Sequence, residues 1–353
     1  MISFFSIHNF RGWSYESLHI HTHEAIIGKN GSGKTHILEA IHLVSGWSLP
    51  YFQPPKDEIS TFYLGYNEVW GIKNYGLTRE ETWDKYTIQW AKVTGKKYRS
   101  ALPYRTVMVS PFDMNLLYFA PKERREYIDS ILERVFEQFR TVRREYDGIM
   151  RQRNALLKNI RDALAERKDL DFWDKQFSEK AYVYALYRKK WYNFLLEQID
   201  IFSFFLGKYT LSCKYESRYF HEDDIEKSIY NYLIENRERD ILTGHTHIWP
   251  HLDDFEFFVE DGGVKHSATT YLSRGEHKML LLGLKQIEIL FLRKYLSLPI
   301  ILLFDDLFAE LDMNHAEKII EQFDVDQLIL TSQRELPKTE KWTHFSCINL
   351  SPE

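Results

Sequence analysis

The stretch that decides the fold is a glycine-rich loop, which reads Gly28-Lys29-Asn30-Gly31-Ser32-Gly33-Lys34-Thr35. It matches the pattern GxxxxGK[ST] at every fixed position. The segment 23–27, which ends in the apolar residues AII, precedes the loop, and a periodic apolar segment, 34–44, follows it. This order predicts a strand, a turn and a helix. Glycines let successive backbone N–H groups turn toward phosphate oxygens, and the helix start adds its positive dipole end.

Two side chains of this loop indicate its ligand. Lys34 supplies a point charge to the β and γ phosphates of a nucleoside triphosphate, and the hydroxyl of Thr35 is a ligand for Mg²⁺. The backbone of the whole loop, from Gly28 to Thr35, surrounds the phosphates in this interpretation. The pattern therefore predicts a site for ATP and Mg²⁺.

A second candidate site follows the continuous apolar run 300–304, which ends in Asp305 and Asp306. Such a run is typical of a strand that is buried on both faces of a parallel sheet. Ligands of open α/β sheets lie beyond the carboxyl ends of the strands. We therefore expect Asp305 to hold Mg²⁺ and Asp306 to polarise the attacking water. A strand followed by an ordinary acidic turn is the alternative.

A third candidate is the stretch 272–278, LSRGEHK, which opens a strongly apolar helical segment. Ser273 is a natural N-cap, and together with Gly275 it can present hydroxyl and amide donors to a phosphate. An ordinary capped core helix is the competing interpretation. The stretch lies about 30 residues before the Asp305 strand, which leaves room for one helix and a turn and favours the phosphate site.

Composition and charge narrow the class of protein. The 353 residues include 46 Lys and Arg against 51 Asp and Glu, and a net charge of −5 excludes a protein that coats nucleic acid by net charge alone. Two distant cysteines exclude a zinc site built on thiolates. No apolar run is long enough to span a membrane, so we expect no membrane association and a cytoplasmic location.

The chain alternates between sheet and helix regions. Residues 58–110 predict antiparallel strands with turns at 74–76 and 94–95. Residues 122–205 contain one glycine and no proline, and their apolar periodicity predicts long helices that are interrupted near 168–172. The segment 122–168 is locally basic, with 13 Lys and Arg against nine Asp and Glu.

The three motifs together resemble ABC-type ATPase heads of the SMC-like branch, whose signature helix begins LSxGxxK. The stretch 309–312, AELD, is similar to their D-loop, and residues 9–11, NFR, resemble their N-terminal element, whose arginine lies near the nucleotide. The resemblance implies that Asn9, Arg11 and Asp312 also belong to the nucleotide site. SMC chains carry hundreds of residues of coiled coil between their halves, which this chain lacks room for.

A closer resemblance is to the RecF family of DNA replication and repair proteins. Five stretches are similar to elements of that family and occur in its order: 109–114, VSPFDM; 120–129, APKERREYID; 146–158, YDGIMRQRNALLK; 173–176, WDKQ; and 250–254, PHLDD. The collinear order makes the resemblance specific. The sequence departs from the family at Phe112, Trp249 and Leu252, and Glu276 stands where the signature usually carries Gln. These departures bear on the rate of hydrolysis and its regulation.

The resemblance implies an α/β fold, in which an ABC-type P-loop ATPase head carries an inserted α-helical arm. The predicted divisions are 1–115 and 237–353 for the two halves of the head and 116–236 for the arm. In this interpretation ATP joins two copies into a homodimer, because the Ser273 loop of one chain completes the phosphate site of the other. A weak, DNA-stimulated hydrolysis of ATP then dissolves the dimer.

The implied partners are single- and double-stranded DNA at gaps or junctions and recombination mediators of the RecR and RecO type, with recombinase loading as the outcome. The cations of the arm are candidates for phosphate contacts, although about half should instead pair with acidic neighbours such as Glu145 and Asp147: Arg124, Arg125, Arg143, Arg144, Arg151, Arg153 and Lys158. Two alternatives stay open. One is the ATPase subunit of an SMC-like defence or toxin system, and the other is a transporter ATPase, which the absence of a coupling helix disfavours.

Overall fold

The computed structural model describes residues 1–11, 13–44, 60–68, 71–82, 85–92, 104–118, 121–217, 224–247, 253–306, 313–337 and 339–350. By packing, the chain divides into two units, Met1–Met114 with Glu288–Glu353, and Asn115–Ile287. This division by packing does not decide the functional boundaries expected at residues 116 and 237, which stay a prediction. In the described ranges, no helix is both long and apolar enough to cross a bilayer.

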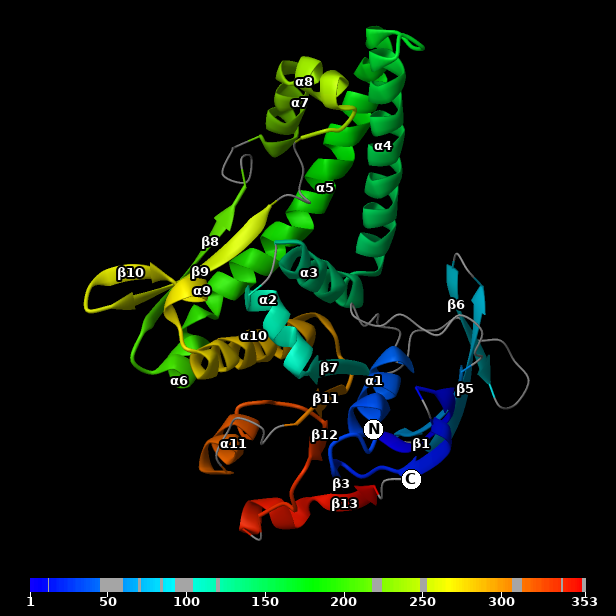
Figure 1. Ribbon diagram of the computed structural model, residues 1–353, viewed down its shortest axis with the longest axis vertical. Helices are drawn as coiled ribbons and strands as arrows, with labels where there is room; N and C mark the ends of the chain where they lie inside the picture. The colour runs from blue at the N-terminus through cyan, green and yellow to red at the C-terminus, as the bar shows by residue number, and fades with distance from the viewer. Residues whose placement is uncertain are drawn as a thin grey trace. The chain divides into compact units, whose positions relative to one another are not determined.

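A five-stranded parallel sheet organises the first unit, with the strand order β13-β3-β12-β11-β7 (Figure 1). Every residue of β11 and β12 is buried, as expected for strands that are covered on both faces. Because the strands are parallel, their carboxyl ends share one edge of the sheet. The strands are β3 His23–Gly28, β7 Arg105–Val109, β11 Ile300–Phe304, β12 Gln327–Ser332 and β13 Ser346–Leu350.

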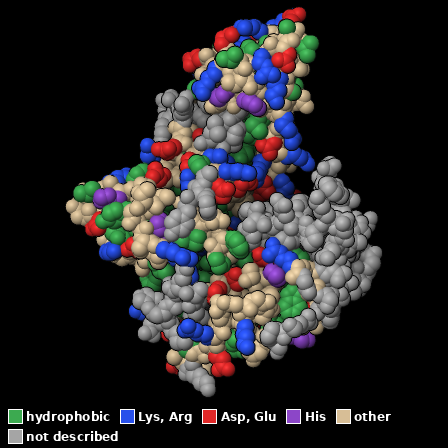
Figure 2. All heavy atoms as spheres, in the orientation of Figure 1, with side chains coloured by type: hydrophobic (Ala, Val, Ile, Leu, Met, Phe, Trp, Pro, Cys, Tyr) green, Lys and Arg blue, Asp and Glu red, His purple; other side chains and the backbone are tan. Residues whose placement is uncertain are grey.

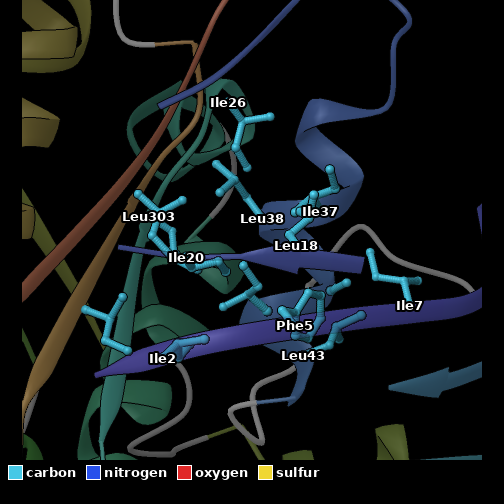
Figure 3. Packing of buried hydrophobic residues seen from close by; sticks show 14 of the residues in the cluster. Ile2, Phe5, Ile7, Leu18, Ile20, Ile26, Ile37, Leu38, Leu43 and Leu303 are labelled. Atoms are coloured by element: carbon cyan, nitrogen blue, oxygen red, sulfur yellow. The ribbon is translucent and has the colours of Figure 1, made fainter. Parts of the chain in front are cut away.

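Helix α1, Lys34–Val44, anchors the glycine-rich loop to this sheet. Its apolar side chains Ile37 and Leu38 are completely buried, in one cluster with Phe5 and Ile7 of strand β1, Ile2–Phe10, and with Leu303 of β11 (Figure 3). Full burial of such a side chain contributes roughly 1.5–3 kcal/mol. The loop is therefore held between two well-packed elements.

A second, antiparallel sheet of the first unit has the order β2-β1-β4-β5-β6. The predicted antiparallel set is present, but the expected turn at residues 74–76 is wrong. Strand β5 runs through it, because Gly76 pairs with Tyr63 on one side and Ala91 on the other. The expected turn at 94–95 lies outside the described residues. The further strands are β2 Trp13–His19, β4 Ser60–Glu68, β5 Gly71–Thr82 and β6 Lys85–Lys92.

The second unit is built on long helices, as the sequence predicts. Helices α4, Glu137–Arg161, and α5, Leu170–Glu197, pack along each other (Figure 1). The break between them lies at residues 162–169, slightly earlier than expected, and Phe136 forms a second break before α4. The shorter helices are α2 Asn115–Tyr118, α3 Pro121–Val135, α6 Phe202–Leu206, α7 Ile225–Glu235, α8 Arg237–Thr243 and α9 Ala268–Tyr271.

A three-stranded antiparallel sheet, β10-β9-β8, completes the second unit. Helix α10, Arg274–Tyr295, contains the boundary between the two units, and α11, Met313–Ile320, belongs to the first. The helical segment predicted from Ser273 is therefore present. The strands of this sheet are β8 Thr210–Glu216, β9 Asp254–Asp261 and β10 Val264–Ser267.

Candidate functional site

The glycine-rich loop joins β3 to α1, as the sequence predicts. Gly31 and Gly33 have φ of +80° and +82°, in the left-handed region that glycine adopts at no steric cost. Gly33 has a second constraint, since an added Cβ would lie 2.5 Å from Nε1 of Trp13. The Trp13 ring therefore covers the loop at a position where only glycine fits. Within the loop, Ser32 is buried, whereas Lys29 and Asn30 are exposed.

The side chain of Lys34 lies back over the loop that precedes it. Its Nζ donates to the carbonyl oxygens of Gly28 at 2.6 Å and Lys29 at 2.8 Å. Burial lowers the pKa of Lys34, while Asp306 and Asp305 oppose that change. The ammonium group thus lies inside the loop, next to two carboxylates from the end of β11.

Thr35 and Asp305 meet at the carboxyl edge of the parallel sheet. Thr35 Oγ1 is 3.0 Å from each oxygen of Asp305, although the two residues are 270 positions apart. Thr331, at the end of β12, donates to Asp305 Oδ1 at 2.7 Å. Burial raises the pKa of Asp305, and the hydrogen bonds from Thr331 and Thr35 oppose the rise. Two hydroxyls therefore orient one buried carboxylate.

Asp306 occupies a constrained backbone position beside this pair. Its φ is +50°, which costs a residue with a side chain about 1–3 kcal/mol. Its backbone N–H donates to Thr331 Oγ1 at 2.8 Å, and Gln333 Nε2 donates to Asp306 Oδ2 at 3.0 Å. The sequence reasoning missed Thr331 and Gln333. The available signal was the apolar run 328–330, because polar residues that follow a buried parallel strand lie at the ligand-binding edge of the sheet.

Arg11 of the NFR element pairs with a buried carboxylate. Its Nη1 lies 2.5 Å from Oε2 of Glu39 on α1, whose side chain is completely buried. Burial raises the pKa of Glu39 to about 7, although the guanidinium opposes the rise. Glu39 was not anticipated from the sequence. Asp312 and the side chain of Asn9 lie outside the residues that the structure describes, so their roles stay predictions.

The loop around Ser273 belongs to the second unit and forms a capping box at the start of α10. Ser273 Oγ donates to Glu276 Oε2 at 2.7 Å, and the Ser273 backbone N–H donates to the same oxygen at 2.8 Å. An added Cβ at Gly275 would have no described atom within 4 Å. Packing within the described chain therefore does not require a glycine at this position.

Three of the seven candidate DNA-contacting cations form hydrogen-bonded ion pairs with carboxylates of the same chain. Arg124 donates to Asp254 at 2.8 Å, and Arg153 donates to Asp174 at 2.7 Å. Arg143 donates to Glu126 at 2.7 Å and to Glu133 at 3.0 Å. Their partners come from other helices and strands, and the expected neighbour Glu145 pairs with Lys180 instead. Arg144, Arg151 and Lys158 are exposed.

The residue types at the carboxyl edge fit Mg²⁺. A hydroxyl and a carboxylate are hard oxygen ligands, and Mg²⁺ keeps several waters and phosphate oxygens in addition to one or two protein ligands. Within the described ranges, no group of three or more His, Cys, Asp or Glu side chains could hold a metal by itself. Thr35 and Asp305 suit an ion that phosphate oxygens and waters also ligate.

Taken together, the parallel sheet, the glycine-rich loop and the acidic strand end define a P-loop ATPase of the α/β class. Residues 1–247 match the family model of the AAA ATPase domain. The DNA replication and repair protein RecF of Azobacteroides pseudotrichonymphae is 30% identical to this chain, over 84% of this chain and 80% of that protein. The chain belongs to the RecF family.

Further similarities agree with this assignment. The DNA replication and repair protein RecF of Ruminiclostridium cellulolyticum is 27% identical over 86% of this chain and 84% of its own. A solved structure of the recombination mediator protein RecF-ATP in the RecFOR pathway matches 96% of this chain and 93% of its own, with a TM-score of 0.84 and 22% identity. The latter likeness supports the fold.

Proposed function

We propose that this chain is an ATP-dependent DNA-binding protein of recombinational repair and replication, which recognises single-strand gaps or junctions and helps to load recombinase. ATP binding joins two copies, and slow, DNA-stimulated hydrolysis separates them. Family membership supports the repair role. The observation that carries the nucleotide part is the contact between Thr35 and Asp305, which brings the loop and the acidic strand end to one point.

Each residue of the site has a distinct role in the proposed ATPase. Lys34 exchanges its loop carbonyls for the β and γ phosphates, and Thr35 and Asp305 hold Mg²⁺. When bound, that ion neutralises phosphate charge. Asp306 accepts the proton of the attacking water, with Gln333 orienting its carboxylate. Three further residues complete the nucleotide contacts: Asn9, Asp312 and Arg11. Glu39 holds the side chain of Arg11 in place.

The Ser273 loop supports the proposed homodimer. Ser273 offers a hydroxyl group at the start of a helix. The space around Gly275 is open, and packing within the described chain does not require a glycine there. A glycine at this position, where an added Cβ would meet no described atom, is consistent with the close approach of another molecule. Ser273→Arg should leave ATP binding by the monomer intact and block dimer formation. Loss of ATP binding in that monomer would contradict the arrangement.

Three exposed cations of α4 form a basic track, defined by Arg144, Arg151 and Lys158. Successive members are seven residues apart, nearly two helical turns, so they share one face over about 21 Å. Figure 2 shows Lys and Arg side chains gathered along this helix. None of the three forms a salt bridge with a described residue. We expect them to bind DNA phosphates without reading sequence.

Titration of gapped duplex DNA at several salt concentrations tests the basic track. Each of Arg144→Ala, Arg151→Ala and Lys158→Ala should reduce the salt slope of binding by about 0.9. Lys175→Ala, an exposed lysine on α5, is the matched control and should leave the slope unchanged. If the salt slopes of all four variants equalled the wild-type slope, the basic track would not contribute to DNA binding.

The remaining partners follow from the same role. Mediators of the RecR and RecO type would act on the ATP-bound dimer at the DNA. We assign the protein to the cytoplasm, because the proposed DNA substrate lies in that compartment. The alternative of a defence or toxin ATPase predicts an ATPase rate that is indifferent to junction DNA, so adding gapped duplex to a steady-state ATPase assay separates the two.

A further inference from the structure

The hydroxyl of Ser273 is already engaged within its own loop. It donates to Glu276 Oε2 at 2.7 Å, and a serine hydroxyl has only one proton to donate. It therefore cannot donate to a phosphate oxygen at the same time. Glutamine at position 276 would differ, since its amide can donate to the hydroxyl oxygen and leave the serine proton available.

A second segment holds the other oxygen of the same carboxylate. Lys208 Nζ lies 2.7 Å from Glu276 Oε1, and the Tyr209 hydroxyl donates to that oxygen at 3.2 Å. Burial favours a higher pKa for Glu276, but the hydrogen bonds from Lys208, Ser273 and Tyr209 outweigh it and lower the pKa to about 2. At neutral pH this group is therefore an anion that only accepts hydrogen bonds.

An anion at this point opposes phosphate binding in two ways. It takes the serine proton, and its negative charge repels a phosphate that approaches Ser273. The ammonium group of Lys208 offsets the charge and retains the carboxylate when the serine turns away. Arg274 and Lys278 add positive charge in the same stretch, but the cation described in an ion pair with Glu276 is Lys208.

We infer that Lys208 is a positioning residue of the phosphate site, which neutralises Glu276 so that Ser273 can turn its hydroxyl to the nucleotide of a second copy of this chain. The inference rests on the proposed function, in which the Ser273 loop serves the other protomer.

The proposed role of Lys208 can be distinguished by experiment from a purely structural role. Its side chain is 66% exposed, and surface pairs of this kind add little to folding stability. The ion pair between Lys214 and Glu216 on β8 is a matched control, with a separation of 3.2 Å and a lysine that is 63% exposed. Glutamine also completes a capping box, so Glu276→Gln should keep the start of α10 intact.

The test is the ATP-dependent dimer dissociation constant, measured by analytical ultracentrifugation for the wild type, Lys208→Ala, Glu276→Gln, the double variant and Lys214→Ala. We expect Lys208→Ala to weaken the dimer roughly tenfold, Glu276→Gln to tighten it, and the lysine substitution to have no effect in the Gln background. Lys214→Ala should match the wild type, and all melting temperatures should agree.

Three outcomes overturn the inference. An equal loss on Lys208→Ala in the Glu and Gln backgrounds, or no loss in either, overturns it alone and leaves the proposed dimer standing. If the wild type forms no dimer with ATP, the proposed function fails and the inference fails with it.

Discussion

Arg153 on α4 and Asp174 on α5 form an ion pair that is fully excluded from solvent, with Arg153 Nε donating to Asp174 Oδ1 at 2.7 Å. The same guanidinium donates to Asp240 Oδ2 at 2.8 Å and also contacts the hydroxyl of Thr246. Arg153 and Asp174 belong to two of the stretches that carry the family resemblance, 146–158 and 173–176. Those stretches are thus partners in one buried network.

Breaking this network should destabilise the protein strongly. Arg153→Ala takes the guanidinium away from the buried carboxylates of Asp174 and Asp240, and leaves Asp174 with Arg237 alone. We expect a loss of about 3–5 kcal/mol in the free energy of unfolding. Arg151→Ala, two residues away on the exposed face, should change it by less than about 0.5 kcal/mol. Urea unfolding followed by circular dichroism measures both. Similar stabilities for the two variants would contradict the buried network.

The two lysines of the glycine-rich loop should behave differently. Lys34→Ala removes the ammonium group that lies within the loop, so ATP binding and ATP-dependent dimer formation should both be lost. Lys29 contributes a carbonyl oxygen to the loop while its side chain is exposed, so Lys29→Ala should bind ATP nearly as well as the wild type. Isothermal titration with ATP compares them. Unchanged affinity in Lys34→Ala would refute the assignment of the loop.

The two aspartates at the end of β11 should separate binding from hydrolysis. Asp306→Asn should bind ATP, hydrolyse it much more slowly and accumulate as a dimer. Asp305→Asn should instead weaken the Mg²⁺-dependent part of ATP binding, because it removes the carboxylate that faces Thr35. Single-turnover hydrolysis and ATP titration with and without Mg²⁺ distinguish the variants. Normal ATP turnover in both variants would show that Asp305 and Asp306 form only an ordinary acidic turn.

Glu39 should give the stability of the protein a particular pH dependence. Its pKa rises from an ordinary value of 4.5 to about 7 in the folded protein, so the folded state binds this proton more tightly than the unfolded state. The resulting stabilisation is present below pH 4.5 and is lost as the pH rises to about 7. Thermal melts of the wild type and Glu39→Gln should diverge across this window, in favour of the variant at higher pH. Parallel profiles would contradict the raised pKa.

Local signals in the sequence predict the strands and the helix that carry the centre of the candidate site. Residues 23–44 contain a strand, a glycine-rich turn and a helix start whose requirements agree, and the structure forms β3 and α1 at the expected residues. The apolar run before Asp305 forms β11 for the same reason. Parallel strand ends then bring Thr35 and Asp305 together without further information.

Long-range pairing is the part that sequence patterns do not determine. The partners of Arg124, Arg143 and Arg153 come from distant segments, so charge alone could not separate them from the exposed cations of the basic track. The pair between Arg11 and Glu39 was missed because a lone glutamate in a helix carries no local signal. The turn expected at residues 74–76 failed because strand pairing on both sides outweighs local turn preference.

The most direct test of the proposed switch is the mass of the particle in solution, measured with and without ATP and with and without gapped duplex DNA. We predict a monomer without ATP, a dimer with ATP, and with both ligands a complex of one dimer on one DNA. A mass that stays monomeric under all four conditions would contradict an ATP-driven dimer that binds DNA.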